Sequence, residues 1–381
     1  MFFTIIIFIL ILGLLIFVHE LGHFIMAKRA GIRVEEFGFG FPPRILGKKI
    51  GETTYSLNLL PIGGFVKIYG EEGEGRDDAY SFASKSIGRR AIIISAGVAM
   101  NLVLAAMLLS LGHWVGLPSI IDDEVIGNLN NPRVQIIQIA SSSPAEEAGM
   151  KIGDTIKSVI LRAEPEESRG KSDKSTGSFT DVQDDVVIVS KVKEVQNFIE
   201  RHKGQEIVLV IQRGGEVLEK TLKPRENPPA GEGPLGVVLA RTAIVSSPWY
   251  QAVIKGISST INLIFAMITS LFGLLWNLVM TGRLAVEIAG PVGIFMLTGQ
   301  AAKLGLIYLL QFTALLSINL AIINILPFPA LDGGRLLFLV IEKIKGSPVS
   351  QKIEKIVHTA GFILLILLML AVTWRDVVKL F

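Results

Sequence analysis

Long apolar blocks constrain this chain more than any other feature of its sequence. Residues 2–18 contain one polar side chain, Thr4, and no charge. Residues 2–27 would cross about 30 Å of hydrocarbon at about 1.5 Å per residue in a helix. The 381 residues are 50% hydrophobic with a mean hydropathy of +0.53, and the excess lies in a few such blocks. A soluble chain of this length has a much lower hydropathy, so the sequence predicts a polytopic α-helical membrane protein.

Four of these blocks are predicted transmembrane helices. They are residues 2–27, 91–112, 304–326 and 359–373. In the second block, Gly97 and Asn101 share a helix face and are predicted to favour close helix packing. A fifth block at 252–281 is long enough to span, but it is rich in Ser, Thr and Asn for a helix in lipid. Length alone therefore does not decide whether this block spans the membrane.

Two histidines and a glutamate interrupt the first apolar block as the motif HELGH, His19 to His23. On a helix, His19 and His23 lie four residues apart and share a face, so their imidazoles can reach one metal ion. Glu20 lies beside them, where it can take a proton from a water molecule that the metal activates. Ionisable side chains within a membrane span are costly and mark a functional site. The alternative is a helix end at the membrane interface with two solvated histidines.

A third metal ligand is predicted at Asp332, in the stretch NILPFPALDGGR that follows the third span. Pro327 and Pro329 end or break the helix there. Irregular backbone at membrane depth is tolerated where it is buried in protein or lines a water-filled cavity. The chain has no cysteine, so a catalytic Zn2+ with three protein ligands must use histidine and carboxylate. The alternative is an aspartate that caps a helix at the membrane interface.

Basic residues predict the orientation of the chain, because they crowd the cytoplasmic side of membrane spans. They follow the first span closely and continue up to the second, as Lys28, Arg29, Arg33, Lys48, Lys49, Arg89 and Arg90. Lys343 and Lys345 follow the Asp332 stretch. We therefore expect the metal site near the cytoplasmic face, with both chain termini outside.

The position of the metal site also predicts whether the block at 252–281 crosses the membrane. The third span must run inward for Asp332 to reach His19 near the cytoplasmic face. A full crossing at 252–281 would reverse that span and place Asp332 on the opposite side of the membrane. We therefore expect 252–281 to lie on the outer leaflet or to dip partly into it, where it could cover the route of substrate entry.

Residues 33–69 indicate β structure, with short strands predicted at Val34–Phe41, Tyr55–Leu59 and Gly64–Tyr69. Glycines between aromatic residues in FGFGF, Phe37 to Phe41, indicate a bulge or a close backbone approach. Two interpretations stay open. The segment is either an ordinary interfacial hairpin or a strand edge that pairs with an extended substrate near the metal.

Residues 113–250 read as a soluble insert of short strands and helices separated by turns. Within it, residues 164–185 are polar and charged, and we expect them to be disordered. Small β-rich modules of this kind often bind peptides by adding a strand to a sheet edge. The net charge of +3 is too small to indicate a nucleic-acid partner.

Four stretches together resemble the site-2 protease family. They are HELGH in a first span, FGFGFPPR after it, SSSPAEEAGMKIGD in the insert and NILPFPALDGGR near the end. The resemblance covers most of the chain, and HExxH paired with LDG is a highly specific combination. It points to the bacterial branch of intramembrane zinc proteases, which act on anti-sigma factors and signal-peptide remnants.

By motif, the resemblance implies that His19 and His23 bind zinc, that Glu20 is the base and that Asp332 is the third ligand. Asn324 resembles a residue that contacts substrate. The family's membrane re-entrant β-loop corresponds to the FGFGF stretch. The residues expected at the substrate there are Phe37, Gly38, Phe39, Gly40 and Phe41.

The resemblance also implies a domain organisation. Transmembrane helices at 1–112 and 304–381 flank a PDZ-like α+β domain at 113–240 and an amphipathic membrane-surface region at 241–303. The implied location is the bacterial inner membrane, with the PDZ-like domain outside the cytoplasm. The implied partners are a single-span membrane protein as substrate, membrane lipid, and a peptide or C-terminus at the PDZ-like domain. Many relatives have two PDZ units where this chain has one, which leaves substrate gating open.

The expected reaction is zinc-dependent hydrolysis of a peptide bond within the membrane. Two other functions stay open. A metal transporter would need further polar residues along its path, and residues 91–112 and 359–373 offer almost none. A catalytically inactive scaffold would act through the PDZ-like domain, which the intact ligand set and Glu20 argue against. His358 lies near a span end and is expected to be interfacial, not a ligand.

Overall fold

The structure is a computed structural model that describes residues 2–124, 130–162, 186–229, 231–282 and 290–378. Two compact units divide the chain, which we call the helical unit, 1–115 with 247–381, and the sheet unit, 116–246. The segment 164–185, predicted to be disordered, lies outside the described residues.

Long helices dominate the helical unit. The predicted spans 2–27, 91–112 and 359–373 each lie within one of them, and 304–326 exceeds its helix by one or two residues at each end. Their bounds are α1 Phe2–Arg29, α2 Ile87–Val115, α5 Trp249–Thr281, α6 Pro291–Leu304, α7 Leu306–Ile325, α8 Asp332–Lys345 and α9 Gln351–Val378. Gly282 and Gly346 end α5 and α8 in the left-handed conformation, where a residue without a Cβ is unstrained. A helix is therefore present at each of the four spans that the sequence predicted.

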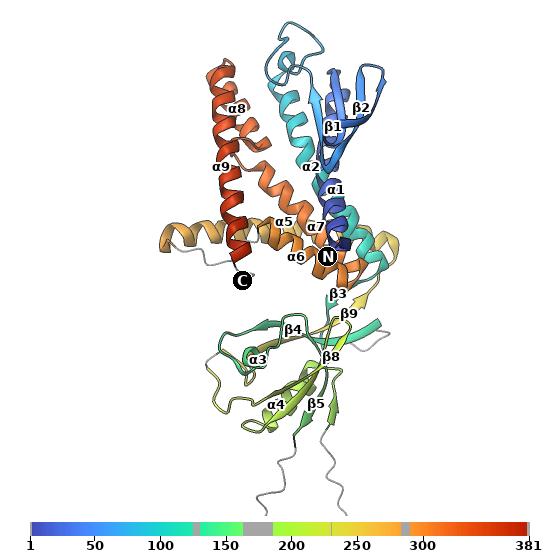
Figure 1. Ribbon diagram of the computed structural model, residues 1–381, viewed down its shortest axis with the longest axis vertical. Helices are drawn as coiled ribbons and strands as arrows, with labels where there is room; N and C mark the ends of the chain where they lie inside the picture. The colour runs from blue at the N-terminus through green and yellow to red at the C-terminus, as the bar shows by residue number, and fades with distance from the viewer. Residues whose placement is uncertain (1, 125–129, 163–185, 230, 283–289, 379–381) are drawn as a thin grey trace, which may run out of the picture. The chain divides into compact units, whose positions relative to one another are not determined.

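Five helices of the described residues are long and apolar enough to cross a membrane, namely α1, α2, α5, α7 and α9. The chain is accordingly a polytopic membrane protein with an added sheet unit. By length and composition, α5 could cross a membrane like the other four helices. It differs from them in direction, since it runs across α2 and α9 (Figure 1).

Helix α5 packs crosswise on α2 and α7. Gly256 of α5 allows the close approach, since a Cβ there would lie 2.5 Å from the Ser110 backbone nitrogen of α2. One apolar stripe of α5 covers the buried Ala105, Leu109 and Ile318 of α2 and α7; its residues are Leu263, Ile264, Met267, Ile268 and Leu271. The opposite face of α5 is exposed in the helical unit and includes Phe265, Phe272 and Trp276.

Residues 34–68 form one long hairpin of β1 Val34–Ile50 and β2 Thr53–Ile68 that folds back on itself. Phe37 lies opposite both Val66 and Tyr55, and Phe39 lies opposite both Gly64 and Leu57. Segment 36–39 is thus an inner strand with pairing on both sides. The sequence prediction missed segment 44–50, which pairs with 53–58, because its Lys and Gly residues are depleted in strands.

The sheet unit is an antiparallel sheet with two helices. Its strands are β3 Leu117–Ile120, β4 Asn130–Ile139, β5 Thr155–Leu161, β6 Val186–Ile188, β7 Ile207–Arg213, β8 Glu216–Leu222 and β9 Val237–Val245. They lie in the order β3, β9, β4, β5, β7, β8, with β6 beside β5. Helix α4, Val192–Arg201, closes the core with Val195, Phe198 and Ile199. Helix α3, Pro144–Glu147, is capped by the Ser143 hydroxyl, which accepts from the Glu146 N–H.

Strands β3 and β9 were not expected from the sequence. They pair with each other from Leu117 opposite Val245 to Ile120 opposite Thr242, so they join the two ends of the insert. Segment 117–120 contains a proline and is too short to show a period of two, which explains the missed prediction. Strand β9 continues past residue 240 and belongs to the sheet unit.

Candidate metal centre

Helix α1 places His19 and His23 on one buried face, with 7% and 8% of their surfaces exposed. The His23 Nδ1–H donates to the Ile93 carbonyl of α2 at 2.9 Å. A bond of this kind fixes the tautomer, so the Nε2 of His23 keeps its lone pair for a metal. The HELGH spacing therefore produces the shared face that the sequence predicted.

Glycines let α2 approach this face closely. A Cβ at Gly22 of α1 would lie 2.3 Å from the Ala96 carbonyl oxygen of α2. A Cβ at Gly97 of α2 would lie 2.4 Å from His23 Nε2 and 2.7 Å from His19 Cε1. Gly97 therefore leaves the space in which the two imidazoles meet. The sequence indicated a packing role for Gly97, and this proximity to the histidines was missed.

The chain between α7 and α8 turns sharply before Asp332. Ala330 has a φ of 76° and donates its N–H to the Nδ1 of His358 on α9 at 2.9 Å. A Cβ at Gly333 would lie 2.1 Å from the Leu326 carbonyl oxygen, so only glycine fits that crossing of the backbone. Asp332 is the first residue of α8, and Leu331 occupies the N-cap position. The carboxylate is thus free to face α1 instead of capping its helix.

Three possible ligand atoms converge from α1 and α8. The Oδ2 of Asp332 lies 3.0 Å from His19 Nε2 and 3.4 Å from His23 Nε2. The two Nε2 atoms lie 3.1 Å apart, and all three ligand atoms lie within 4.8 Å of one another. The Oδ2 is buried and has no hydrogen-bond partner among the described residues. Two imidazole nitrogens and a carboxylate oxygen that converge in this way fit a cation, and this donor set suits Zn2+.

Glu20 lies between these atoms and strand β2. Its Oε2 accepts the backbone N–H of Val66 at 3.1 Å. Glu20, Val66, Asp332 and both histidines line one cavity of about 280 Å³. A carboxylate so placed can exchange a proton with a molecule held in that cavity.

The FGFGF stretch packs on α1, but none of Phe37 to Phe41 is among the described residues that line the 280 Å³ cavity. The ring of Phe37 stacks on Phe24 with centroids 4.8 Å apart, and Phe39 meets Phe17 edge-on at 5.8 Å. The backbone of 36–39 is paired on both sides, so these residues offer no open strand edge. Of the strands predicted at Val34–Phe41 and Gly64–Tyr69, the second lies beside Glu20, through Val66.

Gly40 and Phe41 lie at the bend of the hairpin, away from the ligand atoms. Gly40 has a φ of 81°, and a Cβ there would lie 2.5 Å from the Leu60 carbonyl oxygen. Phe41 is 45% exposed. Asn324 lies in the last turn of α7, half-buried. Asn324 is not among the described residues that line the 280 Å³ cavity.

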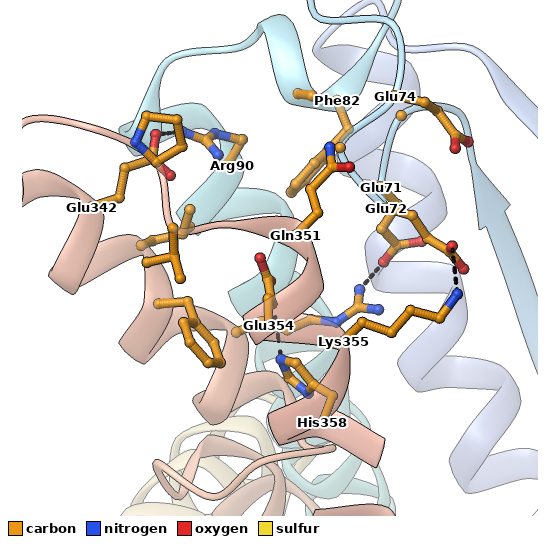
Figure 2. Close-up of a pocket in the computed structure, with 18 of the residues that line it drawn as sticks. Glu71, Glu72, Glu74, Phe82, Arg90, Glu342, Gln351, Glu354, Lys355 and His358 are labelled. Atoms are coloured by element: carbon orange, nitrogen blue, oxygen red, sulfur yellow. Dashed lines mark hydrogen bonds and ion pairs between the residues drawn. The ribbon is translucent and has the colours of Figure 1, made fainter. Parts of the chain in front are cut away.

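A second cavity of about 620 Å³ adjoins the first and is rich in charged side chains (Figure 2). Arg90 of α2 pairs with Glu342 of α8 at 2.5 Å, and Lys355 of α9 lies 3.9 Å from Glu72. Arg335 pairs with Glu71, and these two residues line both cavities. The ion pairs tie α8 and α9 to α2 and to the segment after β2. The Arg335–Glu71 pair lies between the two cavities.

The family model of peptidase family M50 matches residues 7–368. The chain belongs to this family. It is 33% identical to zinc metalloprotease RasP of Bacillus licheniformis, with 99% of each chain covered. It is 32% identical to the regulator of sigma-W protease RasP of Bacillus subtilis, again with 99% of each chain covered.

Family membership confirms the activity expected from the motifs. The chain is an intramembrane zinc metalloprotease, and its metal is Zn2+. Within the described residues, the group of His19, His23 and Asp332 is the one that could hold this ion. The transporter and scaffold alternatives are not favoured.

Proposed function

We propose that His19, His23 and Asp332 hold the zinc ion and that Glu20 is the catalytic base. The proposed reaction is hydrolysis of a peptide bond in the transmembrane segment of a single-span membrane protein. The observation that carries this proposal is the convergence of three ligand atoms within 4.8 Å, with Glu20 on the same cavity. HExxH proteases use this arrangement of two histidines and a base.

The zinc ion, when bound, acts as a Lewis acid on a water molecule and on the substrate carbonyl. Glu20 accepts the proton that the water molecule gives up and later returns it to the leaving amine. The Val66 N–H, at 3.1 Å from Oε2, holds the Glu20 carboxylate in the cavity. The Ile93 carbonyl holds His23 in the tautomer that offers Nε2 to the metal.

The substrate is proposed to bind as an extended strand. A transmembrane helix keeps its peptide carbonyls in internal hydrogen bonds, so the substrate must unwind locally before cleavage. Pairing along segment 64–68 would bring an unwound carbonyl next to Glu20. Gly64 lies close to this place, since a Cβ there would lie 3.9 Å from Glu20 Cγ, and the lack of a Cβ avoids a tight contact of 3.0 Å with the Gly38 carbonyl oxygen.

The residues Phe37, Gly38, Phe39, Gly40 and Phe41 are proposed to support the substrate from the neighbouring strand. Phe37 and Phe39 line an open apolar hollow together with Phe17, which suits an apolar side chain of a transmembrane segment. Asn324 is proposed as a further polar contact to the substrate backbone from the end of α7.

We propose that α1, α2, α7 and α9 span the membrane and that α5 lies along its outer surface. The crosswise direction of α5 supports this, since a helix across the spans cannot share their direction through the bilayer (Figure 1). Both termini and the sheet unit are then outside the cytoplasm in the bacterial inner membrane. The metal centre lies near the cytoplasmic face, and α5 with α6 forms the membrane-surface region that was expected at 241–303.

The sheet unit, residues 116–246, is proposed to be the PDZ-like domain that was expected at 113–240, and it is proposed to bind a peptide or a newly exposed C-terminus. The turn before α3 and the antiparallel sheet support this assignment. One relative is named a regulator of sigma-W protease. We therefore propose an anti-sigma factor or a signal-peptide remnant as the substrate class.

Cleavage of a single-span reporter in liposomes tests the proposal. Glu20→Gln should lower cleavage by about 10²–10⁴-fold while the zinc content stays at the wild-type level. Glu52→Gln, at the exposed turn between β1 and β2, is the matched carboxylate control and should cleave normally. Full cleavage by a zinc-loaded Glu20→Gln protein would contradict the proposed mechanism.

A further inference from the structure

We infer that Asn101 of α2 is a positioning residue that orients His19 for zinc binding by accepting a hydrogen bond from its Nδ1–H. This inference rests on the proposed ligand set, because it assigns Nε2 of His19 to the metal. It goes beyond that set by naming what holds His19 in the required tautomer.

Asn101 is fully buried, with 0% of its surface exposed. Its side-chain amide meets His19 Nδ1 at 3.4 Å, measured from Nδ2. Its Oδ1 is buried and has no hydrogen-bond partner within the residues that the structure describes. An unsatisfied buried acceptor costs about 1–3 kcal/mol, so an amide left in this arrangement would be unfavourable.

The chemistry of the imidazole decides which way the Asn101 amide is oriented. If the Asn101 NH2 donates to Nδ1, then the neutral His19 carries its proton on Nε2, which faces Asp332 and excludes a metal. If the amide is rotated by half a turn, Oδ1 accepts from Nδ1–H and Nε2 keeps its lone pair. The oxygen and nitrogen of an amide are assigned from their hydrogen bonds alone. Zinc binding therefore selects the rotated amide, in which Oδ1 accepts the hydrogen bond from His19 Nδ1–H.

The backbone holds Asn101 in place for this role. The hydroxyl of Ser317 on α7 is fully buried and donates to the Asn101 carbonyl at 2.7 Å. Helix α2 then supports both ligand histidines, His23 through the Ile93 carbonyl and His19 through Asn101. Ile93 and Asn101 lie one turn before and one turn after Gly97, the residue that makes room for the imidazoles.

A packing role alone would have different consequences. An amide that only fills space between α1, α2 and α7 could be replaced by the similarly shaped leucine with a change in stability but none in zinc affinity. A positioning role predicts a weaker metal site, and it predicts that another acceptor at residue 101 restores it. Hydrogen-bond partners of ligand histidines typically contribute 10–100-fold to metal affinity.

The test is zinc affinity by chelator competition on the purified full chain, with the absorption spectrum of the cobalt-substituted protein as a second readout. Asn101→Leu should bind zinc about 10–100-fold more weakly and shift the cobalt spectrum. Asn101→Asp keeps an acceptor and should recover most of the affinity. Thr313→Val is the matched control, because its buried hydroxyl bonds within α7 to the Leu309 carbonyl. It should leave the zinc affinity unchanged.

Wild-type affinity and an unchanged cobalt spectrum in folded Asn101→Leu would overturn the inference. A parallel His19→Ala variant separates this failure from failure of the proposed ligand set. If His19→Ala keeps wild-type zinc affinity, the ligand set is wrong. If only Asn101→Leu is normal, the ligand set stands and the inference fails.

A measurement on the wild type covers the case in which Asn101→Leu does not fold. In the zinc-loaded chain labelled with 15N-histidine, each of the two ligand imidazoles should show an Nδ1 proton protected from exchange with water. One protected proton, that of His23, would overturn the inference, because the Nδ1–H of His19 would then lack its acceptor.

Discussion

Gly97→Ala is the smallest change that should disable the metal centre. It adds one methyl group to α2 at the point where the imidazoles of His19 and His23 meet. The added carbon would lie 2.4 Å from His23 Nε2, while ordinary contact begins at 3.4 Å. The ring would have to retreat by about 1.0 Å, since the backbone of α2 is fixed against α1 at Gly22 and Ala96.

That displacement is large compared with what a zinc ligand tolerates, which is about 0.2 Å around the usual bond length. We therefore expect zinc affinity to fall by about 100-fold or more, the upper end of the effect of misorienting a ligand histidine. Helix propensity works in the opposite direction. Replacing glycine by alanine inside a helix favours the helix by about 1 kcal/mol, so a loss of zinc would not reflect a weaker helix.

The assay compares zinc content, reporter cleavage and thermal unfolding of the wild type, Gly97→Ala and Gly88→Ala. Gly88 lies on the same helix with open space around its missing Cβ. Gly88→Ala should bind zinc and cleave normally. Gly97→Ala should lose both properties while remaining folded. A Gly97→Ala chain with full zinc and full cleavage would refute the assignment of this face of α2 to the metal centre.

Three further predictions concern other parts of the chain. Val66→Pro removes the N–H that Glu20 accepts; reporter cleavage should fall while zinc content, measured in parallel, stays constant. Arg213→Met in the sheet unit breaks the bidentate pair with Asp154, which is 1% exposed. The unpaired carboxylate should lower the free energy of unfolding by about 3 kcal/mol, and Asp154→Asn added to Arg213→Met should recover much of it in denaturant titrations. Burial raises the pKa of the Glu194 carboxyl, but backbone N–H groups before α4 outweigh it and hold the pKa below its usual range. A depressed pKa adds stability above the unfolded value, so Glu194→Gln should lower the thermal midpoint at pH 7, and the difference should disappear as the pH falls below about 4.

Local patterns in the sequence were sufficient for the helices and for choosing the residues that we propose as metal ligands. An apolar block of about 20 residues specifies a helix in lipid without reference to the rest of the chain. The spacing of His19 and His23 fixes their shared face in the same local way. Asp332 was predictable because two prolines and two glycines surround an ionisable residue at membrane depth.

The β structure could not be read fully from the sequence. Whether Phe37 pairs on one side or on both depends on where residues 53–58 fold back, and no local pattern encodes this. Of the two segments that were candidates for substrate pairing, 35–41 and 64–69, the first contains an inner strand at 36–39, and the second includes Val66 beside Glu20. Strand β3 was missed for a similar reason, since the strand that it pairs with in the described part of the chain is β9, at the far end of the insert.

The residues that support the ligands were also hidden from sequence reasoning. Gly97 and Asn101 were recognisable as a small and a polar residue on one helix face. Which residues pack against that face depends on the tertiary structure, and here they are His19 and His23. His358 was expected at the membrane interface, but its ring accepts the Ala330 N–H and so supports the turn before Asp332.

Removal and return of zinc tests the central claim most directly. The wild-type chain in liposomes is stripped with a chelator, and reporter cleavage is measured as Zn2+ is added back against a fixed amount of protein. We predict no cleavage in the stripped protein and full recovery at about one zinc ion per chain, with no recovery in Asp332→Asn at the same zinc level. Cleavage that persists without zinc, or that returns equally in Asp332→Asn, would contradict the account.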